Sequence, residues 1–475
     1  METLYKLKPT NQSLSSLFSL SLALALMAVS NSLLILFLTI SSLSLSIEGI
    51  QNSNNFKPSK YSFSFPLTSR RISRPASAAT LLPSLVSSTS RNPNSSTGSK
   101  NNQSAYKSSF KYSVALIVSL PIGTPPQSQP MVLDTGSQLS WIQCHNKTLA
   151  KPPPFNPSMS SSFSVLPCNH PLCKPRIPDF TLPTDCDQNR LCHYSYFYAD
   201  GTLAEGNLVR EKITFARSQS TPPLILGCGQ DAGAAEGILG MNLGRLSFAS
   251  QARISKFSYC VPVRRNQMKV PPVGAFYLGE NPYSGGFRYV DLLTFNQSQS
   301  QQMPNLDGAA YTVVMEGIRI GGKRLNISRS VFRPNPSGAG QTIIDSGTEY
   351  TFLVEDAYAK VREEVVRLVG PSKVKKGYVY GGALDLCFNG DPVLIRQSIG
   401  GIVLEMGKGV EILVEKERVL AGVGRGVHCL SIGRSELLGV ESSIIGNVHQ
   451  QNLWVEFDLA NRKVGFGRAE CSNSA

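Results

Sequence analysis

Apolar and polar positions alternate over short stretches along most of the chain, which is the pattern of half-buried β-strands. Residues 114–118 form a β-branched apolar run, and the Gly and Pro residues of 121–126 predict a turn directly after it. Similar short runs, separated by Gly and Pro, continue toward the C-terminus. We therefore expect a mainly β protein.

One later segment has the period of a helix instead. Apolar residues occur at 354, 357, 358, 361, 365 and 368, and Gly370 and Pro371 follow. Spacings of three and four place these side chains on one helical face, and a Gly-Pro pair ends a helix. The pattern predicts a helix over 354–369.

The N-terminal region differs from the rest of the chain. Lys6 and Lys8 precede an apolar, Ser-spaced stretch from about 14 to 47, and we interpret residues 1–47 as a signal peptide or signal anchor. The stretch is long enough to span a bilayer, so membrane anchoring stays open, but a cleaved signal peptide is favoured. Residues 48–111 are rich in Ser, Asn, Pro and Arg. We expect them to be a disordered or weakly ordered low-complexity pro-segment or linker.

The net charge of +14 is concentrated in the same region. Residues 1–111 contain eleven Lys and Arg and two Glu, a charge of +9, which leaves +5 for the remaining residues. A nucleic-acid-binding protein would instead cluster basic residues with stacking aromatics on a folded domain. The charge distribution therefore argues against a nucleic-acid partner.

All ten cysteines lie beyond the leader, between Cys144 and Cys471. Asn146, Asn296 and Asn326 each begin an Asn-X-Ser/Thr sequence, the acceptor of N-glycosylation. An even number of cysteines behind an apolar leader indicates an oxidising compartment. We expect a disulfide-bonded glycoprotein of the secretory pathway, in the endoplasmic reticulum, the vacuole or the extracellular space.

Four of the cysteines lie close together, with one histidine between them and a second directly after the last, and such a set can bind zinc. The spacing does not match the close Cys pairs of common structural zinc sites, so disulfides are favoured, with no metal. Their pairing cannot be read from the sequence. The residues are Cys168, Cys173, Cys186, Cys192, His170 and His193.

An apolar pair followed by Asp, a small hydroxyl residue, Gly and a second hydroxyl residue occurs twice, at 132–137 and 343–348. Each copy is followed, at nearly the same distance, by two apolar residues and a glycine, at 238–240 and 444–446. This repetition indicates two similar lobes, and each lobe contributes one carboxylate, Asp134 or Asp345.

Two facing carboxyl groups cannot both ionise cheaply, so they share one proton. The charged carboxylate can accept a proton from water while its protonated partner donates to a carbonyl oxygen. This chemistry hydrolyses peptide bonds without a metal or another cofactor.

These motifs resemble those of the pepsin-like aspartic proteases, and more closely the plant nepenthesin-like and atypical members, over residues 112 to 471. The resemblance implies a two-lobed fold with the active site between the lobes: an N-terminal lobe, 112–300, with Asp134 and a flap, and a C-terminal lobe, 301–475, with Asp345. It implies that neighbouring hydroxyl residues orient the two carboxylates, and that the backbone of two glycines allows close access to the active site. These supporting residues are Thr135, Gly136, Ser137, Ser346, Gly347 and Thr348.

The resemblance also identifies a flap over the site. Aromatic residues alternate through 194–198, and Tyr198 matches the flap tyrosine just before a tight turn that includes Asp200 and Gly201. Trp141 matches the tryptophan whose indole supports that tyrosine. A buried indole and a phenol each need a polar partner, which gives the pair a physical basis.

The family further suggests five disulfides, of which two are nested ahead of the flap. The pairs are Cys144–Cys228, Cys168–Cys192, Cys173–Cys186, Cys260–Cys471 and Cys387–Cys429.

Glu349 is a departure, because the family mostly has a small hydroxyl residue at this position. The fold would place it beside the unprimed side of the substrate cleft, so we hypothesise that it favours a basic or polar substrate residue. An internally paired Glu349 is the alternative.

Together these features predict a monomeric aspartic endopeptidase, made as a zymogen, that acts on protein or peptide substrates at acid pH. The family also includes relatives that bind or inhibit other enzymes with a degraded site. A catalytically silent binding or inhibitor protein is therefore the alternative, although both Asp motifs and the flap tyrosine are intact here.

Overall fold

The computed structural model describes residues 62–73, 106–108, 112–144, 153–174, 184–198, 203–215, 219–229, 236–263, 272–424 and 426–473. They all belong to one compact unit, Pro58–Ala475. The apolar leader, Asn146, Asp200 and Gly201 lie outside these ranges. In the described part of the chain, no helix is both long and apolar enough to cross a membrane.

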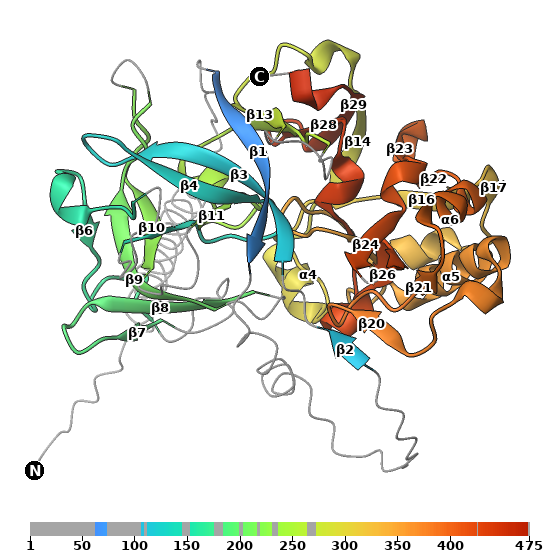
Figure 1. Cartoon of the computed structure of the whole chain (residues 1–475). Helices are drawn as coiled ribbons and strands as arrows, with labels where there is room; N and C mark the ends of the chain where they lie inside the picture. The colour runs from blue at the N-terminus through green and yellow to red at the C-terminus, as the bar shows by residue number, and fades with distance from the viewer. Residues whose placement is uncertain are drawn as a thin grey trace, which may run out of the picture. The chain divides into compact units, whose positions relative to one another are not determined.

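The predicted mainly β class is confirmed (Figure 1). The first half contains the strands β1 (Phe63–Ser73), β2 (Tyr106–Ser108), β3 (Tyr112–Ile122), β4 (Gln127–Asp134), β5 (Trp141–Gln143), β6 (Ser164–Val165), β7 (Asp185–Cys186), β8 (Cys192–Phe197), β9 (Leu203–Glu211), β10 (Leu224–Gly229), β11 (Gly237–Gly240), β12 (Lys256–Cys260), β13 (Val273–Leu278) and β14 (Arg288–Leu293). The second half contains β15 (Thr312–Val313), β16 (Met315–Ile320), β17 (Lys323–Arg324), β18 (Thr342–Ile344), β19 (Thr351–Leu353), β20 (Tyr378–Tyr380), β21 (Cys387–Asn389), β22 (Ile402–Met406), β23 (Glu411–Val414), β24 (Leu420–Gly424), β25 (Val427–Leu430), β26 (Ile432–Arg434), β27 (Ser443–Ile445), β28 (Leu453–Asp458) and β29 (Lys463–Arg468). The α-helices among the described residues are α3 (Phe248–Gln251), α4 (Gln297–Gln302), α5 (Glu355–Val369) and α6 (Pro392–Ile399).

The helix predicted over 354–369 is α5. Its buried face contains Ala357, Tyr358, Val361 and Val365, which follow the predicted spacing. The helix ends at Gly370, whose φ of 96° is disfavoured for a residue with a side chain.

The two halves repeat one strand arrangement around their Asp motifs. In the first half β4 pairs in parallel with β11, so that Asp134 lies opposite Gly240. In the second half β18 pairs in parallel with β27, so that Ile344 lies opposite Ile445. The apolar-apolar-glycine segments that the sequence associates with each Asp are thus its strand partners, which supports the predicted duplication.

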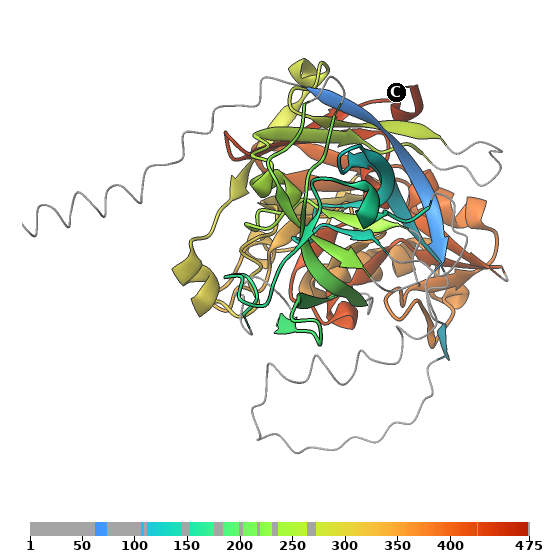
Figure 2. The ribbon, with the colours of Figure 1, turned by 90° about the vertical axis from the view of Figure 1, so that its left-hand side faces the viewer.

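Strands from both ends of the chain meet in one antiparallel ribbon with the order β3-β1-β13-β12-β28-β29-β14. Figures 1 and 2 show the long strand β1 lying along β3 within this ribbon. Aromatic rings pack beneath it: the Phe257 and Phe457 centroids are 4.7 Å apart, and those of Tyr311 and Phe457 are 4.2 Å apart. The ribbon and its core therefore join segments that are far apart in sequence.

The expectation of weak order throughout 48–111 is wrong for Phe63–Ser73. These residues form β1, which is paired on both edges, and the side chains of Leu67 and Ser69 are buried. The average composition of residues 48–111 does not reveal this strand, because the alternating Phe63, Phe65 and Leu67 are surrounded by Ser, Arg and Pro.

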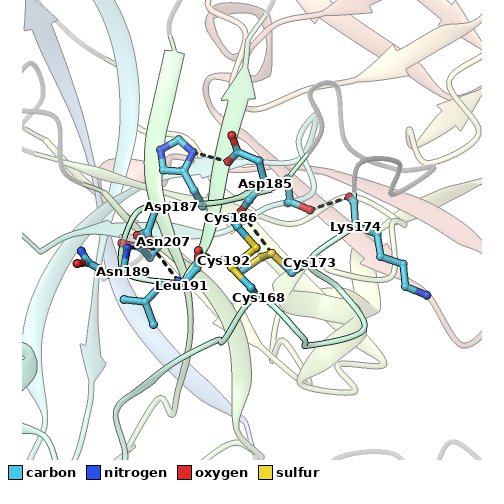
Figure 3. Close-up of a disulfide and its surroundings, with 12 residues drawn as sticks. Cys168, Cys173, Lys174, Asp185, Cys186, Asp187, Asn189, Leu191, Cys192 and Asn207 are labelled. Atoms are coloured by element: carbon cyan, nitrogen blue, oxygen red, sulfur yellow. Dashed lines mark hydrogen bonds and ion pairs between the residues drawn. A yellow bond between two sulfur atoms is a disulfide. The ribbon is translucent and has the colours of Figure 1, made fainter.

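The structure contains five disulfides. Three have the pairing that the resemblance suggests: Cys144–Cys228, Cys260–Cys471 and Cys387–Cys429. The nested pairs Cys168–Cys192 and Cys173–Cys186 are wrong. The bonds are instead crossed, Cys168–Cys186 and Cys173–Cys192, with Cα–Cα distances of 5.4 and 5.5 Å (Figure 3).

Strand register explains why separation along the chain did not decide this pairing. Cys186 and Cys192 are direct cross-strand neighbours in β7 and β8, so both sulfurs face the same loop. The path of residues 168–173 then determines whether Cys168 or Cys173 bonds to each of them. The Sγ atoms of Cys168, Cys173 and Cys186 lie within 4.8 Å of one another, but all three cysteines are in disulfides rather than available as thiolate ligands.

Candidate active site

The two Asp motifs form adjacent loops at the ends of matching strands. Asp134 is the last residue of β4, and Asp345 directly follows β18. Both side chains are buried, at 7% and 8% exposure. Apolar strands thus lead each carboxyl group into a low-dielectric setting, where burial disfavours the charged form.

Reciprocal hydrogen bonds join the two loops. The Thr135 N–H donates to Ser346 Oγ at 3.0 Å, and the Ser346 N–H donates to Thr135 Oγ1 at 2.9 Å. Each hydroxyl also donates across the pair, Thr135 to the Ile344 carbonyl and Ser346 to the Leu133 carbonyl. These hydroxyl residues therefore fix one loop against the other, in addition to flanking the carboxylates.

The two glycines permit this close approach. A Cβ placed on Gly136 would lie 2.8 Å from the Asp345 carboxylate oxygens, and one on Gly347 would lie 2.3 Å from Asp134 Oδ1. Separations below 3.0 Å are too short for real Cβ contacts. Each glycine thus makes room for the aspartate of the other half.

The carboxylates accept hydrogen bonds from their own loops. The Gly136 N–H donates to Asp134 Oδ1 at 2.9 Å, and the Gly347 N–H donates to Asp345 Oδ1 at 2.8 Å. Asp345 also accepts a short hydrogen bond from the Thr348 hydroxyl on its second oxygen. The Thr348 hydroxyl thus stabilises the charged form of Asp345 through its second oxygen.

Burial, followed by repulsion from Asp345, raises the pKa of Asp134 to about 7. The Ser137 hydroxyl and the Gly136 N–H lower it but do not cancel the increase. Burial and the neighbouring carboxylate therefore favour the protonated form of Asp134 below about pH 7.

Tyr198 and Trp141 make the contact that the resemblance implies. The Trp141 indole N–H donates to the Tyr198 hydroxyl at 2.8 Å. Burial raises the pKa of Tyr198, and the charge of Asp134 contributes to that shift, so the phenol lies near the first carboxylate. The turn that follows, with Asp200 and Gly201, lies outside the described residues.

Polar residues directly after 444–446 support the second loop, and no sequence motif singles out Gln450 among them. Gln450 is fully buried; its amide donates to the Asp345 carbonyl at 3.1 Å and to the Ile445 carbonyl at 2.7 Å. Its oxygen accepts from the Tyr259 hydroxyl at 2.6 Å. A polar run directly after an apolar strand was the available signal, because such residues need specific partners when buried.

His449 lies in the same segment and is also buried. Its Nδ1 lies 2.7 Å from Thr351 Oγ1, and its Nε2 lies 2.9 Å from Ser431 Oγ. Burial, followed by the charge of Arg418, lowers the pKa of His449 to about 3. A neutral imidazole held between two hydroxyls has a structural role here.

Glu349 is engaged within the protein. Its Oε2 accepts from the Val114 N–H at 3.1 Å. Burial, followed by the charge of Glu349, raises the pKa of Tyr350. This internal pairing matches the alternative considered for Glu349 and leaves the specificity hypothesis without structural support.

Comparison with known proteins agrees with these features. The sequence model for "Xylanase inhibitor N-terminal" matches residues 116–271, and that for "Xylanase inhibitor C-terminal" matches residues 310–468. The two matches cover the two Asp motifs separately.

Curated relatives extend over most of the chain. Aspartic proteinase PCS1 of Arabidopsis thaliana is 39% identical over 77% of this chain and 84% of its own. Aspartic proteinase nepenthesin-1 of Nepenthes gracilis is 34% identical over 75% of this chain and 78% of its own.

Solved structures show the same fold at lower identity. The crystal structure of edgp has a TM-score of 0.57 and 18% identity, and covers 89% of this chain and 99% of its own. Conglutin gamma, a basic 7S globulin from lupine seeds, has a TM-score of 0.55 and 15% identity, and covers 87% of this chain and 98% of its own. The fold, the duplicated motifs and these relatives together show that the chain belongs to the plant pepsin-like aspartic protease family.

Proposed function

We propose that this protein is an aspartic endopeptidase that hydrolyses peptide bonds in protein or peptide substrates, with Asp134 and Asp345 as its catalytic dyad between two lobes. The observation that carries the proposal is the close reciprocal packing of the two loops, in which each glycine makes room for the other half's aspartate. The relatives named aspartic proteinases support the same activity.

In this mechanism the ionised Asp345 accepts a proton from the attacking water, and the protonated Asp134 donates to the substrate carbonyl oxygen. The raised pKa of Asp134 favours this assignment of the proton. The Thr348 hydroxyl stabilises the Asp345 carboxylate during the reaction. Tyr198, held by Trp141, covers the bound substrate and reduces the access of water.

A binding or inhibitor role is the second candidate, because the matching family models are described as xylanase inhibitors. Loss of a carboxylate or of its flanking residues would favour that role. Here both motifs keep their hydroxyl residues and their glycines, so catalysis is the better-supported function.

We further propose that the protein matures in the secretory pathway as a glycosylated, monomeric zymogen. Five disulfides are consistent with an oxidising compartment. Asn296 and Asn326 are exposed and accessible to glycosylation. Mass spectrometry of the protein purified from secretory fractions, before and after enzymatic deglycosylation, tests this proposal.

The decisive experiment for catalysis is cleavage of a generic protein substrate between pH 3 and 7 by the purified wild type, Asp134→Asn and Asp345→Asn. We expect each substitution to reduce kcat/KM by roughly 10²–10⁴-fold with the fold intact. Inhibition of the wild type by a transition-state analogue of aspartic proteases should accompany this loss. A folded, processed wild type that cleaves nothing, yet binds a xylanase, would replace catalysis with the binding role.

A further inference from the structure

The strand β1 is built into the folded protein along its whole length. Residues 63–68 pair with β13, and residues 67–73 pair with β3. Leu67 is 0% exposed and Ser69 is 3% exposed. Removal of this strand would expose apolar core and leave backbone groups of two neighbouring strands without their partners, which is costly for buried groups.

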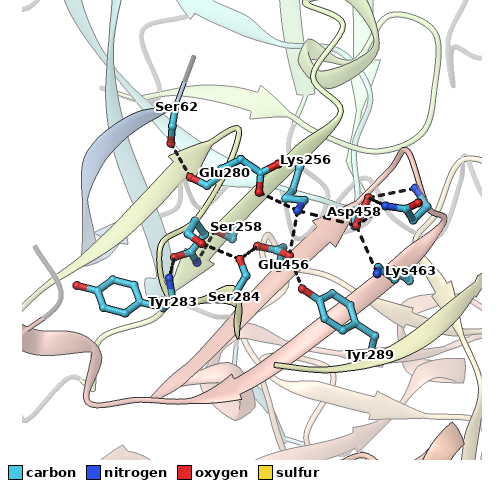
Figure 4. Close-up of polar contacts among 12 residues, drawn as sticks. Ser62, Lys256, Ser258, Glu280, Tyr283, Ser284, Tyr289, Glu456, Asp458 and Lys463 are labelled. Carbon is cyan, nitrogen blue, oxygen red and sulfur yellow. Dashed lines mark hydrogen bonds and ion pairs between the residues drawn. The ribbon is translucent and has the colours of Figure 1, made fainter. Parts of the chain in front are cut away.

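The N-terminal end of β1 adjoins a charged network that runs from the exposed Glu280 to the buried Glu456 and Asp458 (Figure 4). The Ser62 hydroxyl donates to the Glu280 carbonyl oxygen at 2.5 Å. The Glu280 carboxylate lies 3.0 Å from Lys256 Nζ, which also lies 3.9 Å from the fully buried Glu456 and 4.0 Å from Asp458. This end of the strand is therefore fixed to the central ribbon.

The C-terminal end reaches the second catalytic loop. Arg71 is the register partner of Val114 in β3. The Val114 N–H donates to Glu349 Oε2 at 3.1 Å, and its carbonyl oxygen accepts from Asn447 Nδ2 at 3.4 Å. The same Asn447 amide donates to the Ser346 carbonyl at 3.0 Å. Both backbone groups of Val114 are thus bound by side chains that belong to the Asp345 loop or contact it.

Charge links Arg71 to the same cluster. Burial raises the pKa of Tyr350 and of Tyr380, and the negative charge of Glu349 raises both further. The Arg71 cation opposes both shifts. Arg71 therefore acts electrostatically on the same two tyrosines as Glu349, with the opposite sign.

We propose that β1 is a permanent strand of the active enzyme and that Arg71 and Glu349 are positioning residues, which hold the Asp345 loop against β3. This inference rests on the proposed function. It excludes removal of the whole of 48–111 at maturation: processing must cut before Ser62, or within 74–105 with β1 retained in the sheet.

A site-specific cut tests the first part. A recognition sequence for an exogenous protease, inserted within 74–105 of the full chain, allows the linker to be cleaved after folding. We expect the β1 fragment to stay with the remainder in native size-exclusion chromatography and to separate only in denaturant. Release of the fragment with activity and thermal stability unchanged would overturn the proposal, whereas release with loss of both would support it.

Point variants test the second part. Arg71→Ala and Glu349→Gln should each reduce kcat roughly tenfold with little change in KM, because a displaced catalytic group slows chemistry more than binding. Hydrogen exchange of a peptide spanning 341–350 should also become faster. The matched control is Arg70→Ala, which removes the same charge from the same strand but on its opposite face.

Hydrogen exchange separates this inference from the proposed function, because it needs no activity. An inactive wild type with faster exchange in Arg71→Ala and Glu349→Gln would retain the positioning role and remove the catalytic one. An active wild type in which both variants match Arg70→Ala in kcat and in exchange would leave the function standing and overturn the positioning role.

Discussion

Around Asp134 and Asp345 the two halves repeat one backbone frame, but different groups support the two loops. The Asp134 carbonyl accepts from the backbone N–H of Met241 at 2.8 Å, whereas the Asp345 carbonyl accepts from the Gln450 side chain at 3.1 Å. The second loop also contacts β3 through Glu349. No such side-chain support of the Asp134 carbonyl occurs among the described contacts.

This difference shows how a duplicated frame becomes an asymmetric site. Backbone hydrogen bonds in the first loop persist through most substitutions, because every residue except proline supplies the same N–H group. The second loop depends on particular side chains, so single substitutions can loosen it. Variants that target these side chains therefore measure the asymmetry directly.

The largest expected effect is on kcat/KM, when either of the two glycines that both Asp motifs share is replaced. Gly347→Ala and Gly136→Ala would force a methyl group against the opposite aspartate. An overpacking cost of about 1–3 kcal/mol that falls on the transition state corresponds to roughly 5–150-fold in kcat/KM. Gly347→Ala should be the more damaging, since its contact is 2.3 Å rather than 2.8 Å. Steady-state kinetics and thermal unfolding measure both effects.

Gly285→Ala is the matched control for these variants, because a Cβ there would meet nothing within 4 Å. Equal activity in all three alanine variants and the wild type would show that the two loops are not in close contact.

The next effect is a pH limit on activity. Because the pKa of Asp134 is raised to about 7, the singly protonated pair is lost above that pH, and kcat/KM should then fall about tenfold per pH unit. The folded state binds more protons than the unfolded state between about pH 4 and 7, so this group's contribution to stability falls as the pH rises through that window. A pH–rate profile with an alkaline limb near pH 5 would contradict the raised pKa.

A smaller effect, on the free energy of unfolding, is expected when the side chains that support the second loop are replaced. Gln450→Leu would leave the Asp345 carbonyl and the Tyr259 hydroxyl without their partner, at a cost of about 1–3 kcal/mol in the free energy of unfolding. Tyr259→Phe removes only one of these bonds and should cost less. Urea unfolding of both variants provides the comparison, and equal costs would argue against support of Asp345 by Gln450.

The last effect is gradual in pH and concerns acid stability. The pKa of His449 is lowered to about 3, so the unfolded state binds more protons than the folded state between about pH 6.5 and 3. Stability should therefore decrease as the pH falls through this window, by at most about 1.4 kcal/mol per pH unit from this group. His449→Asn should flatten that dependence in chemical unfolding measured at several pH values; an unchanged slope would exclude His449 as its source.

The crossed disulfides and β1 show where local patterns stop being informative. Cysteine spacing along 168–192 is compatible with several pairings, and the register of β7 and β8, with the path of the loop, decided between them. Phe63–Ser73 lies within a composition typical of a linker, yet both of its edges are paired by strands distant in sequence.

The sequence by itself determined the mainly β class, the helix α5, the duplicated Asp motifs and the candidate pair Trp141 and Tyr198. The first three depend on residues close together in the chain or on a repeated motif, so pattern and spacing are sufficient, whereas the pair Trp141 and Tyr198 came from the resemblance to the family. Only the tertiary structure decided the place of β1, the crossed disulfides and the internal pairing of Glu349 with Val114. These features depend on contacts between distant segments, and such contacts follow from strand pairing and burial, which a single sequence does not display.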